Sequence, residues 1–191
     1  MAVVQPIHHR FDFEDYLRVE EDSGIKHEFL AGRVWAMAGG SPDHAGIAAN
    51  VSGLLRNQLA DKPCRVFTSD LRIGVQATEL VTYPDVSIVC GSLVLDPIDR
   101  TGHTIANPKV LVEVLSPSTA DYDRGEKLRH YRLIPSLEAS LLVDHEAQRL
   151  ELWQRSGEDW RRTESTEAIT IDAIGCTLAV ADVYRDPLRP A

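Results

Sequence analysis

The chain has 191 residues, a length at which one domain can bury most of its apolar surface and two full domains would be cramped. Hydrophobic residues make up 43% and charged residues 26%, which are ordinary values for a globular protein. The formal net charge of −9 repels polyanions and argues against strong sequence-independent DNA binding by a monomer. We therefore expect a single domain over residues 1–191, with residues 1–10 as a flexible N-terminal arm.

The N-terminal third of the chain predicts a helix, a β-hairpin and a second helix. Asp12 can cap the first helix, with Asp15 as its capping-box partner. The segment 28–37 holds two apolar stretches on either side of an Ala-Gly turn and predicts the hairpin. Apolar residues recur at helical spacing over about 42–60, after Ser41 as a plausible cap. The apolar side of this second helix must lie on a sheet.

The rest of the chain predicts strands and one more helix. The helix covers about 122–133. Leu128 and Tyr131 should point inward, whereas Lys127 and the three arginines of this helix should point largely outward. A long loop is expected over 91–108. Predicted strands cover residues 65–75, 82–90, 109–115, 139–143 and 150–153, with further short strands over 160–183. This pattern favours an α/β fold with a mixed β-sheet flanked by helices and additional β-hairpins.

Targeting signals and cysteine patterns are sparse. The first ten residues lack a basic region followed by an apolar core, and no apolar stretch approaches the roughly 18 residues that span a bilayer. Cys64, Cys90 and Cys176 are odd in number and far apart, which favours neither a disulfide framework nor a zinc site. We expect a cytoplasmic protein without a membrane segment, whose cysteines are buried thiols in a reducing compartment.

Two acids in apolar surroundings point to a site. Glu113 lies inside the apolar run 110–115, and Asp85 follows a proline at the start of another apolar run. A carboxylate among branched aliphatic residues is expensive to desolvate unless a cation or several donors meet it. A divalent metal between the two acids is one solution, and oxygen ligation suits Mg²⁺ or Mn²⁺. Turn amides around Asp85, and a structural salt bridge from Glu113 to Lys127 or Arg72, are the alternatives.

Several short motifs occur in an order that carries a resemblance. They are Tyr-Pro-Asp-Val at 83–86, Val-Glu-Val-Leu-Ser-Pro-Ser-Thr at 112–119, Tyr-Asp-Arg-Gly-Glu-Lys at 122–127, Ala-Gly-Arg-Val at 31–34 and Ser-Asp-Leu-Arg at 69–72. The chain resembles the Uma-two family of restriction-endonuclease-like proteins, which belongs to the PD-(D/E)XK nuclease superfamily. The likeness extends from about residue 11 to residue 144.

This resemblance implies a restriction-endonuclease-like α/β core, a divalent metal and hydrolysis of phosphodiester bonds. It implies that Asp85 and Glu113 are the two acids of the superfamily motif and that Glu28 is an additional acid. The superfamily pattern places a lysine two residues after the second acid, where this chain has Leu115. Lys127 on the following helix is the natural substitute, and the family likeness points to the same residue.

The expected site therefore has a definite division of roles. Asp85 and Glu113 would hold Mg²⁺, with Mn²⁺ as a substitute, assisted by the backbone carbonyl of Val114. Lys127 would orient the attacking water or neutralise charge on the phosphoryl group. Glu28 could hold a second ion or position the first through water. His44 on the second helix is a candidate for indirect support only.

Three functions compete. The leading hypothesis is a Mg²⁺-dependent DNA endonuclease that acts as a homodimer, because a duplex presents two strands to be cut. The second is a catalytically inactive nuclease-fold module that binds nucleic acid or regulates, and Leu115 and the acidic net charge favour it. The third is a metal-dependent phosphoesterase on small substrates, which suits an acidic protein better than duplex DNA does.

Overall fold

The computed structural model describes residues 10–116 and 120–188. The expected arm over 1–10 therefore lies outside the described residues except for Arg10. The helical elements are α1 (Phe13–Ser23), α2 (Pro42–Gln58), α3 (Ala120–Tyr122), a π-helical turn η1 (Asp123–Lys127), α4 (Leu128–Tyr131) and α5 (Val180–Val183). Within the described part of the chain, no helix is long and apolar enough to cross a membrane.

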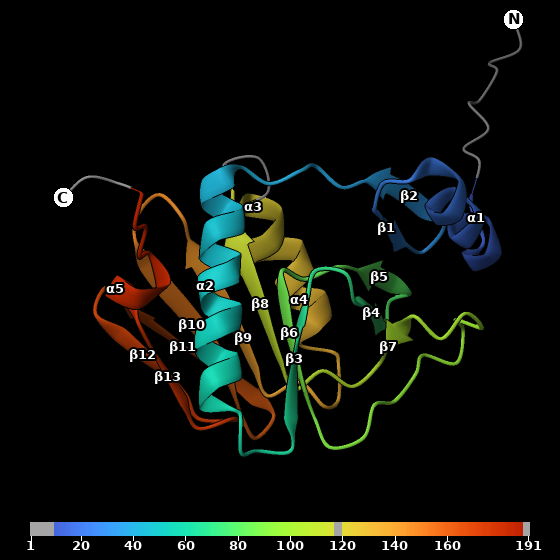
Figure 1. Cartoon of the computed structure of the whole chain (residues 1–191). Helices are drawn as coiled ribbons and strands as arrows, with labels where there is room; N and C mark the ends of the chain where they lie inside the picture. Colours follow the sequence, from blue (N-terminus) through green and yellow to red (C-terminus); the bar gives the residue numbers. More distant parts are fainter. Residues whose placement is uncertain (1–9, 117–119, 189–191) are drawn as a thin grey trace, which may run out of the picture.

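The described strands form three sheets (Figure 1). In sheet order, the six-stranded sheet has β11 (Asp159–Ser165), β10 (Arg149–Ser156), β9 (Ala139–Asp144), β8 (Val110–Leu115), β6 (Val86–Cys90) and β3 (Cys64–Thr68). The five-stranded sheet has β2 (Arg33–Ala36), β1 (His27–Leu30), β5 (Leu80–Thr82), β4 (Arg72–Val75) and β7 (Thr104–Ile105). The third sheet is a hairpin of β12 (Ala168–Ile171) and β13 (Cys176–Ala179).

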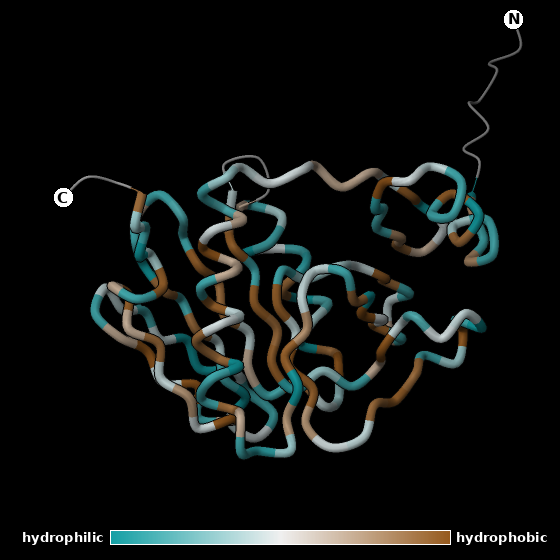
Figure 2. The backbone as a smooth tube through the Cα atoms, viewed as in Figure 1, coloured by the Kyte–Doolittle hydropathy of each residue, from teal (hydrophilic) through white to brown (hydrophobic). Residues whose placement is uncertain are grey.

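The six-stranded sheet is mixed, as expected for an α/β fold. Strands β8 and β9 run parallel and are joined by the crossover of α3, η1 and α4, whereas the other pairs are antiparallel. Helix α2 covers one face of this sheet, and the crossover and the five-stranded sheet lie beyond the other face (Figure 1). Figure 2 shows that the hydrophobic segments concentrate on the central strands. Strand β8 is buried along its whole length because both of its faces are covered.

Side chains along β8 point alternately to the two faces of the six-stranded sheet. Val112 and Val114 pack in the same cluster as Val51 and Leu55 of α2. Leu111 packs instead with Tyr131 of the crossover. Because side chains alternate along a strand, Glu113 shares the face of Leu111 and points away from α2.

Several local predictions are confirmed. Asp12 and Asp15 form a capping box at the start of α1, and Gly24 ends this helix in the left-handed conformation. The turn between β1 and β2 is Ala31-Gly32, both with positive φ. The Ser41 hydroxyl accepts a hydrogen bond from the backbone N–H of His44 and caps α2.

Two predicted long strands are wrong as single elements. The segment 65–75 divides into β3 and β4, and the segment 82–90 divides into β5 and β6. In each case the two halves belong to different sheets, so the chain crosses between sheets twice. Pro84 lies at the second crossing and has no N–H to donate to a ladder, which interrupts the strand there. The crossing leaves Asp85 immediately before β6, where the two sheets meet.

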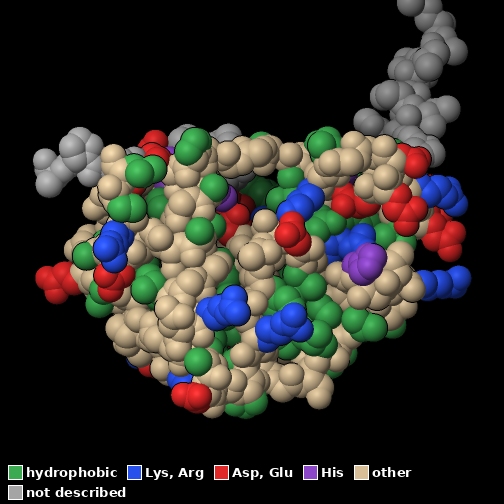
Figure 3. Space-filling view, in the orientation of Figure 1, with side chains coloured by type: hydrophobic (Ala, Val, Ile, Leu, Met, Phe, Trp, Pro, Cys, Tyr) green, Lys and Arg blue, Asp and Glu red, His purple; other side chains and the backbone are tan. Residues whose placement is uncertain are grey.

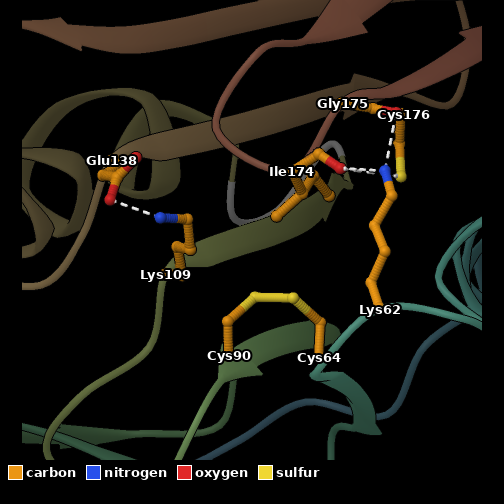
Figure 4. The surroundings of a disulfide bond; sticks show 8 residues. All are labelled: Lys62, Cys64, Cys90, Lys109, Glu138, Ile174, Gly175 and Cys176. Atoms are coloured by element: carbon orange, nitrogen blue, oxygen red, sulfur yellow. Dashed lines mark hydrogen bonds and ion pairs between the residues drawn. A yellow bond between two sulfur atoms is a disulfide. The ribbon is translucent and has the colours of Figure 1, made fainter.

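The predicted state of the cysteines is wrong for Cys64 and Cys90 and confirmed for Cys176. Cys64 and Cys90 are direct partners in the antiparallel register of β3 and β6, and they form a disulfide (Figure 4). Cys176 is free and buried, close to the Lys62 ammonium that donates to the carbonyls of Ile174 and Gly175. Strand register, which spacing along the chain does not reveal, brings the two sulfur atoms together. The disulfide removes the support that the cysteines gave to a reducing compartment.

The crossover differs from the predicted helix over 122–133. It has a π-helical turn between two short α-helical pieces instead of one continuous α-helix. Lys127, predicted to face outward, is only 4% exposed, and Asp123 is buried beside it. Leu128 and Tyr131 do point inward as predicted. Such π turns are rare and often occur at functional sites.

Candidate active site

A cavity of about 580 Å³ lies where the two large sheets meet the crossover helices. It is lined by all the residues that the sequence nominated: Glu28, His44, Asp85, Glu113, Val114 and Lys127. These residues come from β1, α2, the segment before β6, β8 and η1. The fold therefore brings together residues that are up to 99 positions apart along the chain, from Glu28 to Lys127 (127 − 28).

Asp85 lies immediately before β6, opposite the position of Glu113 on the neighbouring strand β8. Val86 is paired with Val112 in the antiparallel register of β6 and β8. Continuing that register by one residue sets Asp85 opposite Glu113, on the same side of the sheet. This is the placement expected for two acids that share one ion.

The carboxylate of Asp85 is held by two donors. Its Oδ2 accepts a hydrogen bond of 2.7 Å from the backbone N–H of Val114. The same oxygen lies 3.3 Å from Nε2 of His44. With Oδ2 engaged in this way, the orientation of the carboxylate is set by β8 on one side and by α2 on the other. Asp85 is thus not satisfied by turn amides alone, as one alternative supposed.

His44 owes its position to the linker that precedes α2. The imidazole packs against Gly40, where an added Cβ would lie 2.6 Å from Nδ1 of His44. A side chain at this position would displace the ring. The hydrogen bond to Asp85 raises the pKa of His44, and partial burial opposes the rise. His44 therefore contacts a predicted metal ligand directly, which is a closer role than the sequence suggested.

Glu113 is buried and carries two partners. The Tyr131 hydroxyl donates to Oε1, and the Lys127 ammonium lies 3.1 Å from the same oxygen. Burial raises the pKa of Glu113 to about 8, and the nearby charges of Asp123 and Asp85 act in the same direction. Lys127 opposes this rise without cancelling it. The folded protein therefore binds a proton at Glu113 more readily than the unfolded chain does.

Lys127 connects the acids of the two sheets. Its ammonium lies 3.0 Å from Oε1 of Glu28, 3.1 Å from Glu113 and 3.6 Å from Asp123. Burial alone lowers the pKa of this lysine, but the surrounding negative groups, Glu113 foremost, outweigh burial and raise the pKa well above its usual value. Lys127 stays charged, and it is near both Glu113 and Glu28.

Glu28 reaches the site from the five-stranded sheet. The Thr82 hydroxyl on β5 donates to its Oε1, which also receives the Lys127 ammonium. Glu28 is 3% exposed, so its charge is compensated inside the protein. Glu28 and Glu113 therefore share the ammonium of Lys127 as a common ion-pair partner.

Sequence reasoning missed two members of the cluster. Asp123 has no role in the site expected from the sequence, and Tyr131 is expected only to point inward. The spacing 123, 127, 131 is a signal that could have found them, because residues four apart lie on one face of a helix. That face meets Glu113, which explains why three polar side chains are buried on it.

The donor set fits a hard divalent cation. Four acids, Glu28, Asp85, Glu113 and Asp123, line the cavity with one lysine, which leaves an excess of negative charge. Among the described residues, no three His, Cys, Asp or Glu side chains converge as a ready-made metal cluster. Mg²⁺ commonly binds through one or two carboxylates and keeps several waters. Asp85 and Glu113 are the residues that could hold such an ion.

Comparisons with known proteins place the chain in a family. The Uma2 family, described as "Putative restriction endonuclease", matches residues 13–181. Two uncharacterized proteins of Synechocystis are similar to this chain. The protein slr1290 is 38% identical over 176 residues, which cover 90% of each chain. The protein sll1609 is 34% identical over 151 residues, which cover 78% of this chain and 84% of that protein.

A solved structure shares the fold. It is the crystal structure of a "putative nuclease belonging to DUF820" from Anabaena variabilis, and its TM-score to this chain is 0.70. The match covers 90% of this chain and 96% of that chain at 15% sequence identity, so it concerns the fold. With a family match over most of its length and relatives above 30% identity, the chain belongs to the Uma2 family.

Proposed function

We propose that this protein is a Mg²⁺-dependent nuclease that hydrolyses phosphodiester bonds of DNA in the cavity around Asp85 and Glu113. The observation that carries the proposal is the convergence of these two acids and Lys127 in one cavity, although they come from three different elements. The descriptions of the Uma2 family and of the Anabaena structure support the nuclease assignment.

The chain's own residues have separable tasks in this mechanism. Bound Mg²⁺ would supply Lewis acidity toward a phosphoryl oxygen and lower the pKa of a bound water. Asp85 and Glu113 would hold the ion, each already oriented by its hydrogen bonds. Lys127 can orient the attacking water or neutralise charge that develops on the phosphoryl oxygens. The backbone carbonyl of Val114 remains a proposed further ligand.

The missing superfamily lysine has a physical substitute. Leu115 occupies the expected position near the end of β8, and it is 2% exposed and apolar. The π-helical turn instead supplies Lys127, which reaches Glu113 from the neighbouring element. Compared with the superfamily pattern, the cation comes from a different element, but a cation still lies beside the second acid, Glu113.

The chief competitor is an inactive module in which Lys127 is only a buried structural ion pair. Buried ion pairs with good geometry do occur without any function. Two features favour a working site. The acids outnumber the cations in contact with them, and they line a cavity of about 580 Å³ instead of lying in a closed core. A purely structural cluster gains nothing from either feature.

Metal binding and cleavage test the proposal together. Asp85→Asn and Glu113→Gln each remove one ionisable carboxyl group with little change of shape, and Asp61→Asn at an exposed turn is the matched control. Calorimetric titration with Mg²⁺ should show binding to the parent and to Asp61→Asn and a loss of at least about tenfold in affinity for the other two. A labelled oligodeoxynucleotide should be cleaved only by proteins that bind Mg²⁺, and EDTA should stop the reaction.

Thermal melts in EDTA separate chemistry from folding. Asp85→Asn should melt at or above the parent's temperature, because it relieves repulsion among neighbouring acids. Mg²⁺ should raise the melting temperature of the parent and not of this variant. A parent that neither binds Mg²⁺ nor cleaves DNA would leave the inactive module as the correct assignment.

A further inference from the structure

A second cavity, of about 750 Å³, adjoins the candidate active site. Both cavities are lined by the linker residues 37–40 and by His44, Tyr83 and Asp85. In Figure 3 a hollow is visible below the segment that joins β2 to α2, with acidic and histidine side chains at its edge. A molecule bound at Asp85 would therefore have direct access to this second cavity.

The walls of the second cavity are mostly apolar and small. Helix α2 contributes Ala45, Ala48 and Ala49, and Ile25 and Met37 add larger apolar side chains. The polar groups come from Lys26, Ser52, Thr68 and Ser69, and from the shared residues His44, Tyr83 and Asp85 at the side of the active site. A mainly apolar pocket with some polar groups is the usual setting for a small organic ligand.

The charges of the two cavities are poorly suited to gripping a duplex. Duplex binding without sequence preference relies on lysine and arginine contacts to many phosphates. No arginine lines either cavity in the described part of the chain, and the two lysines that do, Lys26 and Lys127, both carry ion pairs. The net charge of −9 adds a general repulsion of phosphates.

Lys26 nevertheless offers one exchangeable contact. Its ammonium pairs with Asp70, whose side chain is 84% exposed, and lies 5.4 Å from the centre of the Tyr83 ring. Exposed ion pairs contribute little, so Lys26 can exchange Asp70 for a phosphate at small cost while it keeps its hydrogen bond to the backbone carbonyl of Ser69. Lys26 lines the second cavity together with Tyr83, which also lines the active site.

An unstacked nucleobase has the chemistry that these walls would accept. It has flat apolar faces and polar edges, and proteins bind single strands largely through such faces. In a duplex the bases are stacked and paired, and so only the phosphates and base edges are available. A cavity of about 750 Å³ also falls within the usual range for small-ligand pockets, about 300–1,000 Å³.

We propose that the second cavity receives the unstacked base of the nucleotide next to the cleaved phosphodiester, which makes single-stranded DNA the substrate. The proposal rests on the nuclease function proposed above, because that function places the phosphodiester at Asp85. It adds a binding site for the base and a preference between single-stranded and duplex DNA.

The test fills the cavity without touching the acids. Ala45 is exposed on α2 and lines only the second of the two cavities, so Ala45→Phe should obstruct it. Ala60→Phe is the matched control, since Ala60 is exposed just beyond α2 and lines neither cavity. Binding is measured by fluorescence anisotropy with Ca²⁺ in place of Mg²⁺, using a fluorescein-labelled oligodeoxynucleotide alone and annealed to its complement.

The parent and Ala60→Phe should bind the single strand about tenfold or more tightly than the duplex, and Ala45→Phe should lose that advantage. A third ligand, the same strand with abasic residues, should bind the parent about tenfold more weakly than the intact strand. This ligand keeps the test valid even if Ala45→Phe fails to fold.

Each outcome decides one proposal. Equal binding of duplex and single strand, equal binding of the abasic strand, or identical behaviour of the two phenylalanine variants would overturn the base-binding cavity. If these preferences hold but Mg²⁺ produces no cleavage of the single strand, the cavity is supported and the nuclease function fails. If cleavage occurs equally on single strands and duplex, the nuclease function stands and the cavity proposal fails.

Discussion

Lys127 is the residue on which the site most depends. It is a buried ammonium in contact with Glu28, Glu113 and Asp123, so three acids share one cation. Removing the cation leaves buried carboxylates without compensation, which is much more costly than losing a surface pair. The stability of the metal-free protein should therefore reveal the charge balance of the site before any activity is measured.

Lys127→Met should destabilise the metal-free protein by about 3–5 kcal/mol near pH 9, above the pKa of about 8 of Glu113 in the parent, because it leaves buried acids unpaired. Lys109→Met is the control, since Lys109 pairs with the half-exposed Glu138, and its loss should be within about 1 kcal/mol. Urea denaturation in EDTA gives both values. A Lys127→Met variant as stable as the control would show that the acids are already neutral or solvated.

The raised pKa of Glu113 predicts a pH dependence with a definite sign. With a folded pKa of about 8 and an ordinary value of 4.5, the folded protein binds the extra proton more strongly than the unfolded chain does. This contribution is present below pH 4.5 and is lost as the pH rises through about 8. In EDTA, stability should fall by on the order of a few kcal/mol between about pH 6 and about pH 9.

Glu113→Gln cannot lose a proton and should flatten this profile. Urea denaturation at the two pH values, on the variant and the parent, measures the difference. Identical slopes for the two proteins would mean that Glu113 titrates near its ordinary value in the folded state.

At the scale of elements, the linker between β2 and α2 requires a glycine at one particular position, residue 40. Gly39 and Gly40 are adjacent and chemically identical, yet only Gly40 lies against the imidazole of His44. The linker thus contacts His44 near the N-terminus of α2, and His44 in turn contacts the carboxylate of Asp85 before β6. Changes in the linker should reach the site through His44.

Gly40→Ala should displace His44 and disturb Asp85, whereas Gly39→Ala should be silent because an added Cβ at Gly39 meets nothing within 4 Å. We expect Gly40→Ala to weaken Mg²⁺ binding by about tenfold with little change in stability, as for other residues that orient metal ligands. Calorimetric titration on the pair of variants tests this. Equal Mg²⁺ affinities would show that His44 does not orient Asp85.

The disulfide between β3 and β6 is the other element-level feature. It closes a loop with a sequence separation of 26, for which chain entropy predicts about 3–4 kcal/mol of stabilisation. Dithiothreitol should therefore lower the urea midpoint of the parent and leave a Cys64→Ala/Cys90→Ala variant unaffected. Thiol titration of the unfolded, unreduced protein should count one thiol, from Cys176. Three thiols before reduction would disprove the bridge.

At the scale of the whole molecule, the net charge opposes association of two copies, whereas exposed apolar side chains favour it. The net charge of −9 keeps copies of the chain apart, whereas the loop after β6 exposes Leu93, Val94, Leu95 and Ile98, each 45–52% exposed. A homodimer remains our proposal, because a nuclease with two sites could address two strands or two segments of one strand.

Light scattering over a range of salt concentrations tests this proposal. If like charge is what opposes pairing, added salt should screen it and shift the protein from monomer toward dimer. A monomer at micromolar protein concentration at every salt concentration would rule out a functional homodimer under those conditions.

The sequence by itself determined most of the local structure. The capping box at Asp12, the Ala31-Gly32 turn and the Ser41 cap depend on neighbouring residues, which are visible in the sequence. The two acids were visible for a related reason, because a carboxylate in an aliphatic run needs a partner wherever it folds. The order of the motifs then indicated the family, and the family likeness pointed to Lys127 as the cation of the site.

Only the tertiary structure decided what meets at the site. The two strand divisions, the disulfide and the π-helical turn all follow from which strands pair and which faces pack, and local periodicity does not contain that information. His44 and Tyr131 became neighbours of the two acids in the same way. Their contacts are long-range, so they exist only once the sheets and the crossover have assembled.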